Sequence, residues 1–295
     1  MYGSAPMKLV EALVLRDDPE VVDAHLAFQL NAGVDLVLVA GDPSSEAVAD
    51  VLEPYVRSGR VRPVRADADG LTRAALVEHG ADWVLATTAD CFWWPRGEGL
   101  KDVLDVIPAR YTVVQALVRP LRPRAGASAR FWDRLTVRPY ALDASTAELR
   151  PLIRAQPHTT RLSAAAIERQ AVPLRAWYPV EIFDCSRGDE LGEGEIVEGL
   201  ADGTLVEDTR LRDMLERLLG SREASARPEG ARLPFPIPGI VDDAAYAVEC
   251  AAVGEVDLPR LEREVAELEH RIAWLEQRFW PRVWRRLSRL GRSRP

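Results

Sequence analysis

Short apolar runs alternate with amphipathic segments along the first 90 residues of the chain. The runs are rich in Leu and Val and predict strands, and the segments between them carry residues that begin or end helices. The expected strands lie within 8–18, 34–42, 60–67 and 82–90, and the expected helices within 19–33, 44–59 and 69–80. This alternation implies right-handed crossovers, so we predict an α/β fold with a doubly wound, mostly parallel sheet. Binding sites in such sheets lie at the carboxyl ends of the strands.

Aspartates follow each of the four predicted strands. They are Asp17 with Asp18, Asp42, Asp67 with Asp69, and Asp90. The chain lacks the glycine-rich turn of dinucleotide-binding folds and the GxxxxGK motif of nucleoside triphosphatases. An acidic edge repels a bare diphosphate, so it favours a nucleotide held by its base and ribose or through a bridging divalent cation. We therefore predict a nucleotide-sugar site. The alternative is that these aspartates only cap helices and form turns.

Length and composition indicate a globular protein. The chain has 295 residues, of which 47% are apolar and 28% charged, and we expect one large domain over residues 1–220. The cysteines lie far apart without a CxxC pair, so they predict neither a zinc site nor a disulfide framework and fit a cytoplasmic protein. A formal net charge of -8 argues against nucleic acid as a partner. We also expect no signal peptide and no membrane-spanning helix.

The order of segments from residue 8 to about residue 219 resembles the family 2 type glycosyltransferases, whose Rossmann-like nucleotide-sugar-binding fold is called GT-A. The resemblance is carried by residues 13–61, 82–108, 131–139 and 174–190. The second of these stretches is the most specific. In such enzymes it typically has the sequence Asp-Ala-Asp-Glu-Phe followed by Trp and Pro, and its acids hold Mg²⁺ or Mn²⁺ under the diphosphate. The corresponding residues here are Thr88, Ala89, Asp90, Cys91 and Phe92, so Asp90 alone is retained.

The resemblance implies transfer of a sugar from a nucleotide-diphosphate sugar to a hydroxyl of a carbohydrate or lipid-linked acceptor. It places an Mg²⁺ or Mn²⁺ site at Asp90 and Asp184. Donor contacts are expected from Asp17, Asp18, Asp42, Asp67, Asp90 and Arg124. A catalytic base must be a carboxylate or a histidine, and the stretch WYPVEIFD offers Asp184 and Glu181. The alternative is a non-catalytic binding or scaffold protein on the same fold.

Three other features near the expected site each have two interpretations. The loop 119–134 carries five arginines that either bind a diphosphate in place of a metal or form a solvated basic surface. Cys91 has apolar neighbours and no histidine close in sequence, which favours a buried inert thiol over a nucleophile. Trp93 and Trp94 either stack under a sugar ring or pack in the core.

The C-terminal quarter of the chain predicts a helical appendage. Residues 221–245 are rich in Pro and Gly and form either a linker or a strap on the domain surface. Apolar residues spaced by three and four within 246–295 predict a coiled coil that joins two copies, or an amphipathic helix docked on its own domain. Residues 279–295 carry six arginines and no acid, beside Trp280 and Trp284. Such a tail binds an anionic surface at the inner face of the membrane, binds an acidic partner, or stays disordered.

Overall fold

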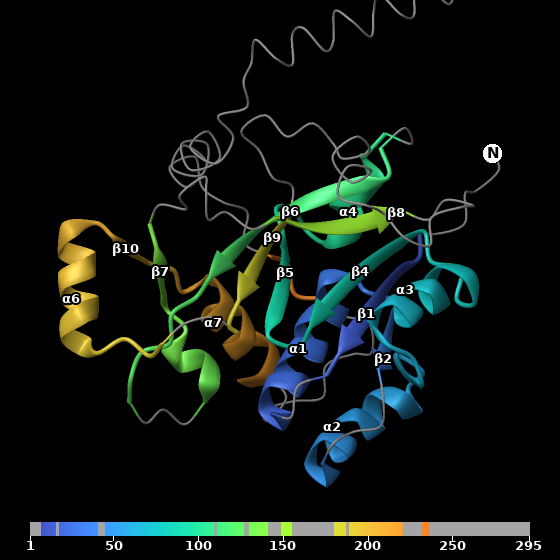
Figure 1. The fold of residues 1–295 in the computed structure, drawn as a ribbon, viewed down its shortest axis with the longest axis horizontal. Coiled ribbons are helices and arrows are strands. Elements are labelled where there is room, and N and C mark those ends of the chain that lie inside the picture. The colour runs from blue at the N-terminus through green and yellow to red at the C-terminus, as the bar shows by residue number, and fades with distance from the viewer. Residues whose placement is uncertain are drawn as a thin grey trace, which may run out of the picture. The chain divides into compact units, whose positions relative to one another are not determined.

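The protein is an α/β structure built around one large sheet (Figure 1). The computed structural model describes residues 7–15, 18–40, 45–108, 111–126, 130–140, 149–154, 180–186, 189–220 and 232–235. The predicted helix and basic tail within 246–295 lie outside the described residues. The predicted membrane surface and homo-oligomer contact therefore stay predictions.

Strands and helices follow the predicted alternation up to residue 88 and continue in a mixed order beyond it. The strands are β1 (Leu9–Val14), β2 (Leu36–Ala40), β3 (Val61–Val64), β4 (Trp83–Thr88), β5 (Cys91–Pro95), β6 (Val113–Pro120), β7 (Val137–Pro139), β8 (Leu149–Arg154), β9 (Val180–Asp184) and β10 (Leu205–Glu207). The helices are α1 (Pro19–Ala32), α2 (Glu46–Arg57), α3 (Ala68–Val77), α4 (Leu100–Asp105), α6 (Glu193–Asp202) and α7 (Arg210–Leu215), with the short helical turns η1 (Phe131–Arg134) and η2 (Glu216–Gly220).

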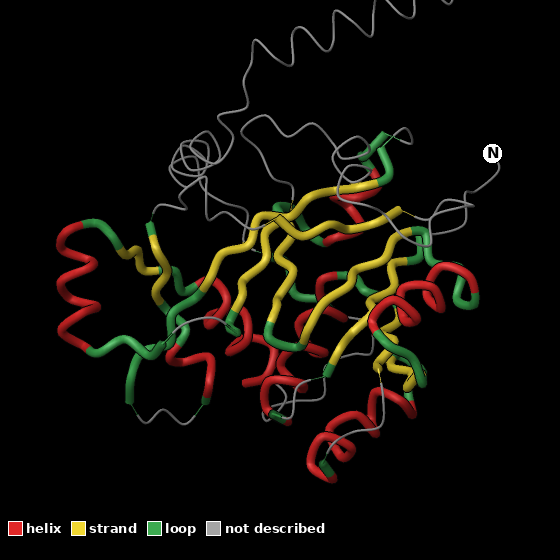
Figure 2. The backbone as a smooth tube through the Cα atoms, in the orientation of Figure 1, coloured by secondary structure: helices red, strands yellow, loops and turns green. Residues whose placement is uncertain are grey.

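Within the described residues the large sheet has eight strands in the order β3-β2-β1-β4-β8-β6-β9-β5. Strands β3, β2, β1 and β4 are mutually parallel, as the predicted mostly parallel sheet requires, and we call them the parallel half of the sheet. Strand β8 is antiparallel to β4 and β6, and β5 is antiparallel to β9, so the sheet is mostly but not wholly parallel. Strands β7 and β10 pair separately, beside α6 and at the end of the sheet away from α2 and α3 (Figure 2).

Side-chain alternation along the parallel strands sorts the core into two layers. Leu9 and Leu13 of β1 pack in the cluster that includes α1 and α2, whereas Val10 and Ala12 pack against α3. Successive side chains of a strand point to opposite faces, so one strand supplies both layers. Both faces of the inner strands β1 and β2 are therefore covered, and these two strands are almost continuously apolar, as is typical of parallel sheets.

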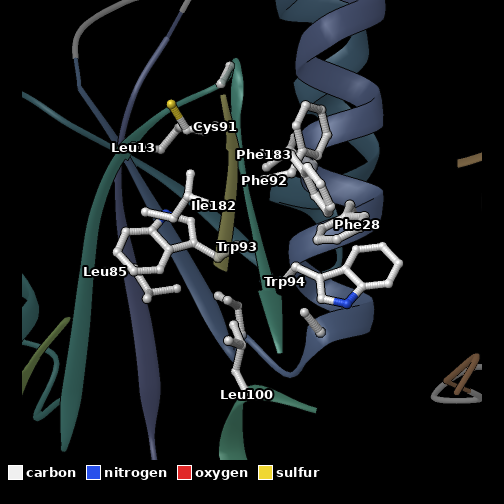
Figure 3. Packing of buried hydrophobic residues seen from close by; sticks show 14 of the residues in the cluster. Leu13, Phe28, Leu85, Cys91, Phe92, Trp93, Trp94, Leu100, Ile182 and Phe183 are labelled. Atoms are coloured by element: carbon white, nitrogen blue, oxygen red, sulfur yellow. The ribbon is translucent and has the colours of Figure 1, made fainter. Parts of the chain in front are cut away.

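Strand β5 carries a buried aromatic pair that joins α1 to the sheet. Figure 3 shows Trp93 beside Leu85 and Ile182, while Trp94 lies on the other side of β5 against Phe28. Both tryptophans are essentially fully buried. The structure therefore supports the interpretation that the two tryptophans pack in the core, and not the one in which they stack under a sugar ring.

The described part of the Pro- and Gly-rich segment lies against α1. The Asn31 side chain accepts a hydrogen bond from the Leu233 backbone N–H at 2.7 Å and donates one to the Leu233 carbonyl at 3.0 Å. The Phe235 ring is buried and lies 5.4 Å from the Phe28 ring, edge to face. Residues 232–235 thus contribute to the core around α1.

Candidate functional site

The carboxyl ends of the parallel strands form one row at a single edge of the sheet. In the strand register Val14 is aligned with both Ala40 and Thr88, and Ala40 is aligned with Val64. Because these four residues end β1, β2, β3 and β4, the loops that follow them start side by side. Asp90 is the second residue after β4, at this edge.

Two of the predicted donor-binding aspartates cap helices at the same edge. The Asp18 carboxylate accepts hydrogen bonds from the backbone N–H groups of Glu20 and Val21, at 3.0 and 3.3 Å. The Asp67 carboxylate accepts one from the Gly70 N–H at 2.8 Å. These contacts satisfy amides at the first turns of α1 and α3, as the capping interpretation requires. Asp17 and Asp42 lie outside the described residues.

Asp90 is held by its neighbours at the turn between β4 and β5. The Thr88 hydroxyl donates to Asp90 Oδ1, and the Cys91 thiol lies 3.7 Å from the same oxygen. The Asp90 backbone carbonyl accepts from the Cys185 N–H at 2.9 Å, which joins this turn to the end of β9. The residue is 9% exposed. Its carboxylate is thus held in a fixed position and is largely buried.

Asp184 lies beside this turn and pairs with Arg150. It stands opposite Cys91 in the β5–β9 register and is fully buried. Its carboxylate accepts from the Ser186 N–H at 2.9 Å and the Ser186 hydroxyl at 2.5 Å, and Arg150 Nη2 lies 3.3 Å from its Oδ2. Arg150 Nη1 also donates to the Cys91 sulfur at 2.8 Å. The structure therefore brings Asp90 and Asp184 together, with an arginine that sequence reasoning missed.

Glu181 lies on the opposite face of β9 from Asp184, because the two are three residues apart in a strand. Its carboxylate is 2.9 Å from Arg119 Nε and 3.3 Å from Arg210 Nη1, and the residue is 1% exposed. Burial alone would raise the pKa of Glu181, but the charges of Arg119 and Arg210 outweigh it and hold the pKa below its usual value. Glu181 is thus a buried partner of two arginines and is not near Asp90.

Arg124 binds to the small sheet instead of the Asp90 turn. Its Nε donates to the Thr136 hydroxyl at 2.7 Å, and its Nη2 lies 3.7 Å from Glu207. The loop that carries it is also bridged to Leu191 by backbone hydrogen bonds. These contacts direct Arg124 toward β7 and β10.

Asp208 completes the buried ion network that contains Glu181. Arg210 holds both of its carboxylate oxygens, at 2.9 and 2.7 Å, and Arg138 Nε lies 2.9 Å from Oδ2. Burial favours the protonated form, but the hydrogen bonds and charge of Arg210, and then of Arg138, lower the pKa of Asp208 to about 2. The carboxylate is therefore ionised over the whole physiological range.

The lowered pKa of Asp208 predicts a loss of stability in acid. A folded-state pKa below the unfolded one stabilises the fold above about pH 4, and this contribution, about 2 kcal/mol, is lost as the pH falls through about 2. The Asp208→Asn variant should be less stable at neutral pH, and its stability should fall less steeply than that of the natural chain between about pH 4 and about pH 2. Urea unfolding at stepped pH measures both, with the exposed Asp50→Asn as the control. If the free energy of unfolding of Asp208→Asn fell with acid as steeply as that of the natural chain, Asp208 would not be a source of the acid sensitivity.

Cys91 has the properties of a structural thiol. Its side chain is fully buried. Burial, as the largest cause, raises the pKa of Cys91 to about 11, although the Thr88 hydroxyl opposes the shift. The nucleophile is the thiolate, so this residue is unreactive near neutral pH. The buried-thiol interpretation is the one the structure supports.

Neither a metal cluster nor a membrane span is found in the described part of the chain. There, no three His, Cys, Asp or Glu side chains are grouped to hold a metal ion. No helix among the described elements is long and apolar enough to cross a bilayer. A hollow of about 380 Å³ on η1, α7 and η2 shares no lining residue with the Asp90 turn; its lining residues are Asp133, Arg212, Asp213, Glu216 and Arg217.

Comparison with known proteins yields structural likeness alone. No family model matches the chain, and no curated protein matches it. Solved structures do match, among them the crystal structure of 4-diphosphocytidyl-2C-methyl-D-erythritol synthase. The two chains are 18% identical, with a TM-score of 0.30, and the match covers 68% of this chain and 100% of that one.

Proposed function

We propose that the chain is a glycosyltransferase that moves a sugar from a nucleotide-diphosphate sugar to a hydroxyl of a carbohydrate or lipid-linked acceptor. The observation that supports it most is that a carboxylate and a guanidinium contact the same thiol at the edge where the four parallel strands end. There Asp90 and Arg150 both contact the Cys91 thiol, at 3.7 and 2.8 Å. A carboxylate suits the hydroxyls of a ribose or a sugar, and a guanidinium suits a phosphate.

The chemistry needs a stabilised leaving group. When the bond from the sugar to the diphosphate breaks, negative charge develops on the diphosphate oxygens, and a fixed positive group beside them lowers the barrier. Arg150 is such a group, because its side chain is 21% exposed although the Asp184 beside it is fully buried. At the same edge Asp90 would contact a hydroxyl of the ribose or of the sugar.

A second candidate is a donor-binding or scaffold protein without turnover. The observation that favours it is the state of the two carboxylates predicted as bases. Glu181 is buried between two arginines, and Asp184 is buried against Arg150 and Ser186. A general base must reach the acceptor hydroxyl directly or through one water.

Calorimetric titration with a panel of nucleotide-diphosphate sugars tests the proposal. We expect at least one donor to bind, and Asp90→Ala to weaken its binding about tenfold by removing a contact to a donor hydroxyl. The exposed Asp105→Ala is the matched control and should bind like the natural chain. Binding without release of nucleoside diphosphate in the presence of an acceptor panel favours the scaffold. Absence of binding to every donor refutes both candidates.

A further inference from the structure

The residues around Asp90 do not fit the divalent cation that the family resemblance implies. Mg²⁺ and Mn²⁺ are held by oxygen ligands, chiefly carboxylates. Thr88 and Cys91 stand where two of the acids are expected, and a sulfur ligand is too soft for these ions. The remaining acid, Asp184, already pairs with the Arg150 guanidinium. A cation placed between Asp90 and Asp184 would meet a positive charge, which opposes its binding.

Arg150 is built into the sheet at this point. It belongs to β8, which is hydrogen-bonded between β4 and β6, and it is aligned with Ala116 of β6. Leu152, two residues further along the same face, is fully buried and anchors the strand. The guanidinium therefore extends from a rigid element, and its contacts with Cys91 and Asp184 fix its plane. Buried carboxylates that hold an arginine in one orientation prepare it to bind a phosphate through its N–H groups.

We propose that Arg150 takes the place of the divalent cation, so that the site binds the diphosphate of its ligand through a guanidinium without a metal. This inference rests on the proposed donor site and specifies how that site meets the diphosphate. The substitution has a cost, because a guanidinium supplies one positive charge where the cation supplies two. Binding should therefore be weak and should fall with rising salt.

Inorganic pyrophosphate is the probe that separates this inference from the proposed function. With EDTA present, calorimetry should detect pyrophosphate binding to the full chain, about tenfold weaker in Arg150→Gln and unchanged in the exposed Arg57→Gln. The double variant Arg150→Gln with Asp184→Asn removes the ion pair without leaving a buried lone charge, so it should fold and show the same loss. The inference would be overturned if the natural chain did not bind pyrophosphate. It would also be overturned if the double variant bound pyrophosphate as tightly as the natural chain does.

Binding of Mn²⁺ alone supplies an independent readout. The natural chain should not bind Mn²⁺ at this site, measured by the paramagnetic signal of the free ion. Arg150→Gln should gain a Mn²⁺ site, because it exposes two carboxylates to each other, and adding Asp184→Asn should abolish that site. Stoichiometric Mn²⁺ binding by the natural chain that Asp90→Asn removes would overturn the inference. Pyrophosphate binding through Arg150 without binding of any nucleotide-diphosphate sugar would instead refute the glycosyltransferase proposal and leave this inference standing.

Discussion

Glu181→Ala is expected to lower the free energy of unfolding by about 3–5 kcal/mol, because it removes the carboxylate from a buried ion pair. Arg119 Nε lies 2.9 Å from Glu181, and both residues are almost fully buried. The Arg119 charge would then keep its cost of burial and lose this attraction. Chemical unfolding followed by circular dichroism measures the loss.

The matched control is the exposed pair of Arg57 with Glu53 on α2, four residues apart. Glu53→Ala should lower the free energy of unfolding by about 0.5 kcal/mol or less, since water screens that pair. The comparison also separates a structural role of Glu181 from a catalytic one. A Glu181→Ala protein with unchanged stability and lost turnover would contradict the structural role argued for it.

Trp94→Ala should also lower the free energy of unfolding by about 3–5 kcal/mol, by leaving a cavity in the core. The indole is 1% exposed. It packs against Phe28, Phe183 and Phe235, with ring centroids at 5.9, 5.4 and 5.0 Å. Aromatic pairs in these geometries add to the stability given by burial.

Trp94→Phe is the conservative control. It should lower the free energy of unfolding clearly less than Trp94→Ala does, because it keeps most of the buried apolar area. The same variants decide between the two interpretations of the aromatic pair. If Trp94→Ala left the unfolding midpoint unchanged but weakened donor binding, the tryptophan would be a sugar platform and the core assignment would fail.

The parallel half of the fold could be predicted from sequence because its signals are local. Each of its strands is a short apolar run, and helix caps such as Asp18 and Ser45 lie where the pattern places them. Strand β8 carries no such signal. It has Pro151 in its middle and arginines on either side, a composition that argues against a central strand. Its place between β4 and β6 depends on pairing with distant segments, which periodicity along the chain does not reveal.

The residues of the candidate site also differ in whether the sequence could identify them. Asp90 could be found from sequence, because it comes just after an apolar strand at the expected edge. Arg150 could not, because it reaches Asp184 and Cys91 from a strand 59 residues further along the chain than Cys91. Grouping Glu181 with Asp184 overlooked a signal that was present, since residues three apart in a strand face opposite ways.

A crystal structure with the tightest-binding nucleotide-diphosphate sugar, grown without divalent metal, tests the central claim most directly. We expect the donor at the carboxyl ends of β1 to β4, with its diphosphate hydrogen-bonded to Arg150 and its sugar or ribose near Asp90. A donor bound at another surface would contradict the account. So would a requirement for a metal ion between Asp90 and Asp184, with Arg150 turned away from the diphosphate.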